Sequence, residues 1–176
     1  MGFNRAIVCS NCDHLKFYID DKLVAEADPD RKEFDHLKYA PFSIEMGELF
    51  HKWGDLRIEG YIQGKLAITR NMSGKGVDEK FILVPDDTNL IADGADSTRV
   101  VFRVTDEFGN IQPFADASLK LELEGPAEII GDNSFALVGG TGAVWIRAQE
   151  QPGRVTLVAA HPQLGRQQIA IEIAAP

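Results

Sequence analysis

Apolar and polar residues alternate with a period of two along much of this chain, and this alternation restricts its fold more than any other feature. Leu15, Phe17 and Ile19 alternate with more polar neighbours, and a second apolar stretch at 23–27 follows a turn-forming Asp-Asp pair. A period of two places successive side chains on opposite faces of a strand, whereas a helix requires a period near 3.6. The segment therefore predicts a β-hairpin.

Several other short segments follow the same pattern. We expect a second hairpin from residues 56–62 and 66–70, and a further strand pair from 99–105 and 118–124. Additional strands are expected at residues 88–92, 142–148, 155–160 and 167–173. Short strands separated by Gly, Asp, Asn or Pro at regular intervals favour β-sandwiches over a parallel sheet.

The sequence Val84-Pro85-Asp86-Asp87 interrupts the apolar pattern near the middle of the chain. A boundary at this point gives two modules, residues 1–84 and 85–176, each close to the roughly 100 residues of an immunoglobulin-like sandwich. The fold class that we predict is therefore all-β, with two immunoglobulin-like β-sandwich modules in tandem.

Two segments depart from the strand pattern. Residues 42–53 carry apolar side chains at a spacing that is compatible with one or two helical turns. Residues 28–38 are rich in charge and contain Pro29, which predicts a solvated loop.

Charge and hydropathy exclude some classes of partner. The net charge is −9, and a surface of that sign repels nucleic acid and anionic lipid head groups. The apolar runs, such as residues 155–160, are much shorter than the roughly 20 residues of a membrane-spanning helix. Residues 1–5 carry no recognisable export signal, but a fragment would have lost the signal of its parent, and so localisation stays open.

The motifs of the first half resemble those of a known enzyme family. Residues 7–13 and 15–22 are similar to the strand, Ser-Asn turn and hairpin that follow the catalytic barrel in family 2 glycoside hydrolases of the β-galactosidase type. The family usually has Asn-Gly-Lys at the hairpin tip, where this chain has Asp20-Asp21-Lys22. Residues 54–60 and 64–66 resemble a later hairpin of that module, with Trp53-Gly54 where the family often has Pro-Gly before the strand.

The second half resembles the final module of the same family in residues 89–96, 100–106, 108–110 and 125–128. The same pattern also resembles the immunoglobulin-like repeats of bacterial adhesins. The first resemblance implies an accessory tail whose partners are the catalytic and other domains of a parent glycosidase. The second implies a binding module for a glycan or a cell-surface protein.

The family resemblance implies that the catalytic residues lie elsewhere. Retaining glycosidases need two facing carboxylates, and in this family they sit on a barrel of roughly 250 residues that cannot fit here beside two sandwiches. The family's acid/base residue follows an Asn, and the chain contains no Asn-Glu dipeptide. We therefore assign no catalytic residue and expect no cofactor.

Cys9 and Cys12 form a Cys-x-x-Cys pair, which elsewhere marks a redox site or half of a zinc site. The second pair of ligands that zinc requires is missing, because none of the four histidines has a suitable spacing. These histidines are His14, His36, His51 and His161. We expect two reduced cysteines, with Cys9 buried in a strand and Cys12 in a turn.

Two acidic clusters, 86–87 and 93–96, offer the oxygen ligands that calcium prefers, but they lack the spacing of a known calcium loop. We interpret both as solvated turns, and Asp93-Gly94 in particular is typical of a tight turn. No metal site is therefore assigned.

Four aromatic residues are candidates for contact with a carbohydrate or with a neighbouring domain of the parent. They are Tyr18, Trp53, Tyr61 and Trp145. Sugars stack on flat aromatic rings beside polar groups. Tyr18 and Trp145 alternate out of phase with their apolar neighbours, and so we expect both to be at least partly exposed. We favour the contact with a neighbouring domain.

Overall fold

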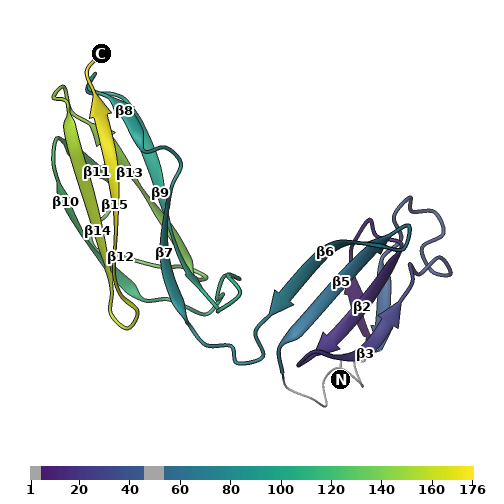
Figure 1. Ribbon diagram of the computed structural model, residues 1–176. Coiled ribbons are helices and arrows are strands. Elements are labelled where there is room, and N and C mark those ends of the chain that lie inside the picture. The colour runs from purple at the N-terminus through teal and green to yellow at the C-terminus, as the bar shows by residue number, and fades with distance from the viewer. Residues whose placement is uncertain (1–4, 46–53) are drawn as a thin grey trace. The chain divides into compact units, whose positions relative to one another are not determined.

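The computed structural model describes residues 5–45 and 54–176, and every regular element in these ranges is a β-strand (Figure 1). The chain divides into two compact units, Met1–Gly76 and Val77–Pro176. No helix of the described ranges is long and apolar enough to cross a membrane. The all-β prediction is confirmed.

The first unit contains a four-stranded antiparallel sheet in the order β3-β2-β5-β6 and a two-stranded sheet of β1 and β4. The bounds are β1 Arg5–Val8, β2 His14–Ile19, β3 Lys22–Ala27, β4 Phe42–Glu45, β5 Leu56–Ile62 and β6 Lys65–Met72. Leu15 and Phe17 of β2 and Phe42 and Ile44 of β4 are buried between the two sheets. The alternation in β2 therefore specifies which side of the strand faces the core.

The two hairpins predicted for this unit are confirmed. β2 pairs with β3 and β5 pairs with β6, both antiparallel. At the first tip Asp20 and Asp21 have positive φ values of 46° and 63°, the conformation that a two-residue type I′ turn requires at both central residues. Asp tolerates this conformation better than most residues, which explains why the Asp-Asp pair forms the turn.

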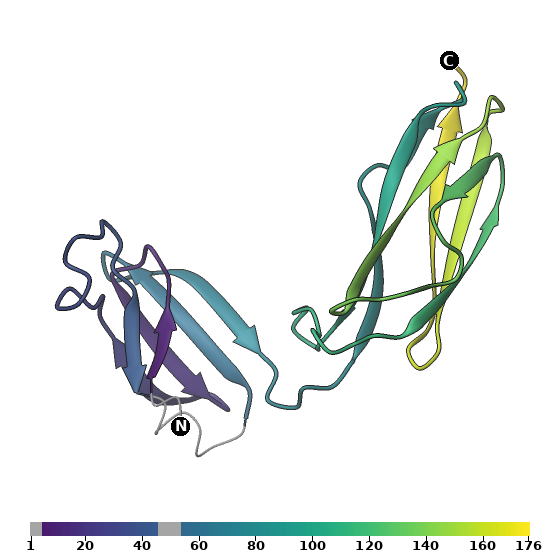
Figure 2. The ribbon, with the colours of Figure 1, turned by 180° about the vertical axis from the view of Figure 1, so that it is seen from behind.

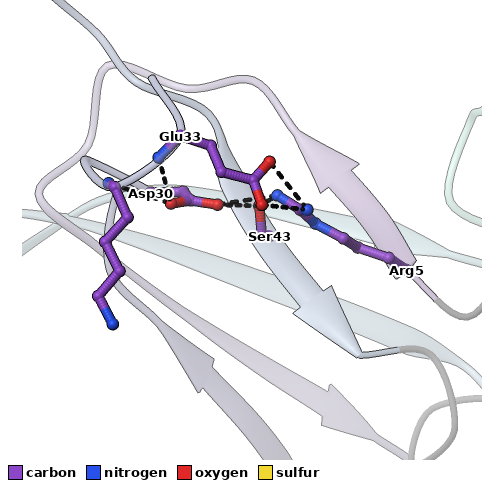
Figure 3. A network of polar contacts seen from close by, with 5 residues as sticks. Arg5, Asp30, Glu33 and Ser43 are labelled. Carbon is purple, nitrogen blue, oxygen red and sulfur yellow. Dashed lines mark hydrogen bonds and ion pairs between the residues drawn. The ribbon is translucent and has the colours of Figure 1, made fainter. Parts of the chain in front are cut away.

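A polar network holds the loop that follows β3 against β1 and β4 (Figure 3). The guanidinium of Arg5 on β1 donates to Asp30 Oδ2 at 2.8 Å and to Glu33 Oε1 at 3.0 Å. The Ser43 hydroxyl of β4 donates to the same Asp30 oxygen at 2.7 Å. This hydrogen bond and those from the backbone keep the pKa of Asp30 below its usual value. The charged segment is thus a loop, as predicted, and Asp30 anchors it.

The predicted helical turns at residues 42–53 are wrong at their start, because Phe42–Glu45 is strand β4 and pairs with β1. Residues 42–45 form a strand because β1 offers them a pairing partner. A rule based on the spacing of apolar residues within one segment does not include such a partner. The remainder of that segment lies outside the described residues.

The second unit consists of two sheets that share one core. The first has the order β12-β10-β14-β15-β8 and the second the order β11-β13-β9-β7. The bounds are β7 Lys80–Pro85, β8 Asn89–Ile91, β9 Ser97–Thr105, β10 Ser118–Glu124, β11 Ala127–Ile130, β12 Phe135–Ala136, β13 Thr141–Ala148, β14 Gly153–His161 and β15 Gly165–Ala174. Figure 2 shows the same strands from behind.

The core of this unit takes alternate residues from both sheets. Phe102 of β9 and Ile146 of β13 come from one sheet, and Leu119 of β10, Leu157 of β14 and Ile171 of β15 come from the other. All five are completely buried. Two sheets that face each other over one apolar layer form a sandwich-like arrangement.

The expected pairing of residues 99–105 with 118–124 is wrong. β9 pairs with β13 and β7, whereas β10 pairs with β14 and β12 in the opposite sheet. The connection between β9 and β10 folds back on itself at Asp106–Asn110 and then crosses to the other sheet. Strands that follow each other in sequence can join different sheets when the connection is this long, as in Greek-key folds.

The boundary between the units also differs from our expectation near Val84-Pro85. Lys80–Pro85 forms β7, which pairs with β9 and therefore belongs to the second unit, and the division lies between Gly76 and Val77. Pro85 ends an edge strand, where the missing N–H group costs no ladder hydrogen bond. The proline that suggested a boundary thus marks the end of a strand.

Candidate functional site

The outer face of the first unit's larger sheet carries two of the four candidate aromatics. On β2 and β5, Tyr18 lies opposite Arg57, and Lys16 lies opposite Glu59. Tyr61 follows Glu59 on the same face of β5. We call these five side chains, Lys16, Tyr18, Arg57, Glu59 and Tyr61, the tyrosine face.

Glu59 is the centre of the tyrosine face. Its carboxylate accepts a hydrogen bond of 2.6 Å from the Tyr61 hydroxyl and pairs with the Arg57 guanidinium. The side chain is only 15% exposed. The Tyr61 hydrogen bond is the main reason that the pKa of Glu59 lies below its usual value, and it raises the pKa of Tyr61 to about 12.

Arg57 limits what Tyr18 can bind. The guanidinium carbon lies 3.9 Å from the centroid of the Tyr18 ring, a cation–π contact. One face of the ring is therefore occupied by the protein itself. The tyrosine face is thus better suited to polar and edge contacts than to the stacking of a sugar on an open ring.

The hydrogen bond that the Tyr61 hydroxyl donates to Glu59 leads to a prediction. We expect Tyr61 to ionise at about pH 12, because loss of its proton removes the hydrogen bond and places two negative charges side by side. The stabilisation is complete below about pH 10, the ordinary tyrosine pKa, and is lost as the pH rises through the folded value. NMR of ¹³C-labelled tyrosine measures this titration.

The matched variants for this titration are Glu59→Gln and Glu26→Gln. Glu59→Gln should move the Tyr61 pKa back toward its ordinary value, because the charged acceptor is lost. Glu26 does not bond Tyr61 and reaches it only through His14 and Lys16, which contact its ring, so Glu26→Gln should move the Tyr61 pKa much less than Glu59→Gln. An ordinary pKa for Tyr61 in the unmodified chain would contradict the network.

The third candidate aromatic lies in the second unit. Trp145 on β13 is 49% exposed, opposite Arg99 of β9 on one side and Ile130 of β11 on the other. Arg99 pairs with Asp86 at 3.0 Å. The partial exposure that the alternation predicted for Tyr18 and Trp145 is confirmed. Trp145 is surrounded by an apolar side chain and paired charges, the composition of many contact surfaces.

The structure brings two of the four aromatics together within one unit. Tyr18 and Tyr61 lie together, Trp145 belongs to the other unit, and Trp53 lies outside the described residues. Sequence reasoning missed Arg57 and Glu59. Their alternation with Tyr61 was visible, but only the register of β5 on β2 brings them to Tyr18.

Both cysteines are free, but Cys9 is exposed, against our expectation of a buried strand residue, and Cys12 is buried. Cys9 follows the end of β1 instead of lying in it, and Cys12 points into the core. A Cβ at Gly60 would lie 2.5 Å from the Cys12 sulfur, so that glycine is required for this close approach. Within the described ranges, no three His, Cys, Asp or Glu side chains gather as a metal site would require.

The acidic clusters are turns. Asp93 Oδ1 accepts the backbone N–H groups of Ala95 and Asp96 at 2.8 and 2.7 Å, and these bonds lower the pKa of Asp93. Asp96 Oδ2 accepts the N–H of Ile91 at 2.8 Å. The carboxylates therefore bind the backbone of their own turn, as the Asx-turn interpretation predicts.

Comparisons with known proteins identify the family. Residues 82–170 match the family model described as glycoside hydrolase family 2 C-terminal domain 5. A β-galactosidase of Thermoanaerobacter pseudethanolicus is 36% identical over 163 residues, which are 89% of this chain and 22% of that protein. A β-galactosidase of Rhizobium radiobacter is 30% identical over 129 residues, 73% of this chain and 94% of that sequence.

A solved structure shows the same fold. A family 2 glycosyl hydrolase from Bacteroides cellulosilyticus matches 97% of this chain and 23% of its own length, with a TM-score of 0.76 at 20% identity. The chain spans about a fifth of the length of the first curated relatives that it matches. The family model covers half of the chain and the relatives cover most of it, so the chain belongs to family 2 of the glycoside hydrolases, as a C-terminal part that lacks the catalytic barrel.

Proposed function

We propose that this chain is the accessory end of a β-galactosidase-like enzyme, in which two immunoglobulin-like modules brace the catalytic barrel and its neighbouring domains. The observation that carries this proposal is the coverage: β-galactosidases match 89% of this chain over only 22% of their own length. In a β-sandwich of this kind the inward side chains form the packed core, and the outward faces are available for contact with partners. The net charge of −9 supports a partner other than nucleic acid or membrane.

An activity assay tests whether catalysis resides outside this chain and whether the chain stabilises the parent enzyme. On a chromogenic β-galactoside we expect the parent enzyme to be active and this chain alone to give no turnover. Deletion of residues 1–176 from the parent should leave an enzyme that inactivates at a lower temperature, because the braced surfaces become exposed. Turnover by the chain alone, or a truncated parent with unchanged activity and thermal inactivation, would refute the proposal.

Carbohydrate binding is the second candidate, and the half-exposed Trp145 is the observation that favours it. Among the described residues no ring contact of Trp145 with another aromatic is present, and a single ring is a weak sugar platform, because sugar sites combine aromatic and convergent polar groups. We therefore expect no retention of the chain on immobilised galactan. Millimolar or tighter binding that disappears in Trp145→Ala would establish the second candidate in place of an accessory role without ligand.

A further inference from the structure

An open groove lies on the inner side of the first unit's larger sheet, between β1 and β6. Its volume is about 370 Å³, and its lining includes Val8 and Cys9 on one side and Ile68, Arg70 and Met72 of β6 on the other, with Ile58 of β5 between them. The core cluster under β1 and β4 draws on β2, β3 and β5, and among the described residues it includes none from β6. We call this hollow the β1–β6 groove.

The β6 wall of the groove is apolar and exposed. Ile68 is 40% exposed and Met72 is 48% exposed, and both lie on the same face because they are separated by an even number of positions. β6 is an edge strand of eight residues, with one side left unpaired in its sheet. Natural sheets usually protect long apolar edges, because such edges pair or aggregate. A partner that covers β6 would remove this exposure.

Arg70 gives the groove its polarity. It lies between Ile68 and Met72 on the same face of β6 and lines the groove. Within the part of the chain that the structure describes, no ion pair or hydrogen bond involves its guanidinium. Arginine at the edge of an apolar patch is typical of a binding hot spot, and it selects a carboxylate or carbonyl partner.

The part of the relatives' sequences that lies outside the match indicates what occupies the groove. This chain is a C-terminal part, and about four-fifths of the length of the relatives lies outside the match. Val8 and Cys9 form one wall of the groove, and Arg5 at the start of β1 lies within about 10 Å of Val8 along an extended backbone. A domain that precedes β1 in the same polypeptide is tethered on the side of this wall, and tethering raises its effective concentration above that of a separate partner.

We propose that the β1–β6 groove seats the domain that precedes residue 5 in the parent enzyme, through apolar side chains over Ile68 and Met72 and an acidic group facing Arg70. This inference depends on the proposed accessory function and specifies the surface that performs it.

Cys9 provides a built-in probe of this contact. It is exposed and lines the groove, whereas Cys12 is buried, and the chain has no other cysteine. Iodoacetamide alkylation followed by fragmentation of tryptic peptide 6–16 measures both thiols separately.

In the chain alone Cys9 should react readily and Cys12 slowly, so that slow labelling of Cys12 reports the folded state. In the parent enzyme Cys9 labelling should fall by about tenfold or more, because access requires the domains to separate.

Two variants of the parent enzyme make the test specific. Ile68→Asp places a charge inside the groove and should restore Cys9 labelling to the rate in the chain alone. Leu66→Asp changes a more exposed apolar residue of β6 that does not line the groove, and it should leave Cys9 protected. Restoration by both variants would indicate a general disturbance of β6 and overturn the assignment to the groove.

Three other results would also overturn the proposal. Equal Cys9 labelling in the chain and in the parent would show an open groove, even if the accessory function holds in the activity assay. Protection in the chain alone that grows with its concentration would identify a second copy as the occupant. Protection in the chain alone at every concentration would show that the chain closes its own groove.

Discussion

Replacing Phe102 by alanine is expected to lower the free energy of unfolding of the second unit by about 3–5 kcal/mol. Phe102 is completely buried, and its ring lies 5.4 Å from Phe135 and 6.3 Å from Phe81, centroid to centroid. Removing the ring loses its transfer energy and the aromatic contacts, and it leaves a cavity that rigid strands on both sides cannot fill. Such a change is a large part of the 5–15 kcal/mol that stabilises an ordinary domain.

Hydrogen exchange of backbone amides in residues 77–176 during urea denaturation measures this loss. Phe114→Ala is the matched control, since the same deletion is made at a side chain that is 94% exposed. We expect Phe114→Ala to change the unfolding free energy by about 0.5 kcal/mol or less. Equal effects of the two substitutions would contradict the assignment of Phe102 to the core.

Replacing Asp106 by alanine is expected to cost the second unit about 2–4 kcal/mol. Asp106 is only 2% exposed and follows β9 at the start of the connection to the other sheet. Its Oδ1 accepts the backbone N–H groups of Phe108 and Asn110 at 2.9 and 2.8 Å, and its Oδ2 accepts the Asn110 side chain at 2.8 Å. Alanine leaves these donors without their acceptor at a buried position, where water replaces it poorly.

The control for Asp106→Ala is Asp93→Ala. The Asp93 carboxylate also accepts two backbone N–H groups, but in an exposed turn where water can take its place. We expect about 1 kcal/mol or less for this variant. Denaturant unfolding monitored by circular dichroism compares the two, and a smaller loss for Asp106→Ala than for Asp93→Ala would show that burial does not strengthen this turn.

The sequence was sufficient for features that depend on neighbouring residues. The alternation of Leu15, Phe17 and Ile19 predicted strand β2 and its buried side, and the Asp20-Asp21 pair predicted the hairpin tip. A turn at Asp93-Gly94 was also predicted, because this pair of residues is typical of a tight turn. The enzyme family followed from motifs in the correct order, and the comparisons confirm it.

The candidate surfaces could be predicted only in part. Alternation indicated that Tyr18 and Trp145 are at least partly exposed, but it did not reveal that Arg57 and Glu59 of β5 lie opposite Tyr18 and Lys16 of β2. The side chain that lies opposite another depends on strand register, and one residue of slip would exchange the two faces. The burial of Cys12 was not predicted for a similar reason, since Gly60 on a distant strand creates the space that Cys12 fills.

The sequence by itself determined the class of the fold, most of the strands, the tight turns and the family, because each depends on chemistry within a few residues or on motifs in a fixed order. Only the tertiary structure decided that β9 and β10 lie in different sheets, that β7 belongs to the second unit and that a groove stays open beside β6. These features depend on contacts between residues far apart in the chain, where many pairings satisfy the same alternation and only the packing of the complete core selects one.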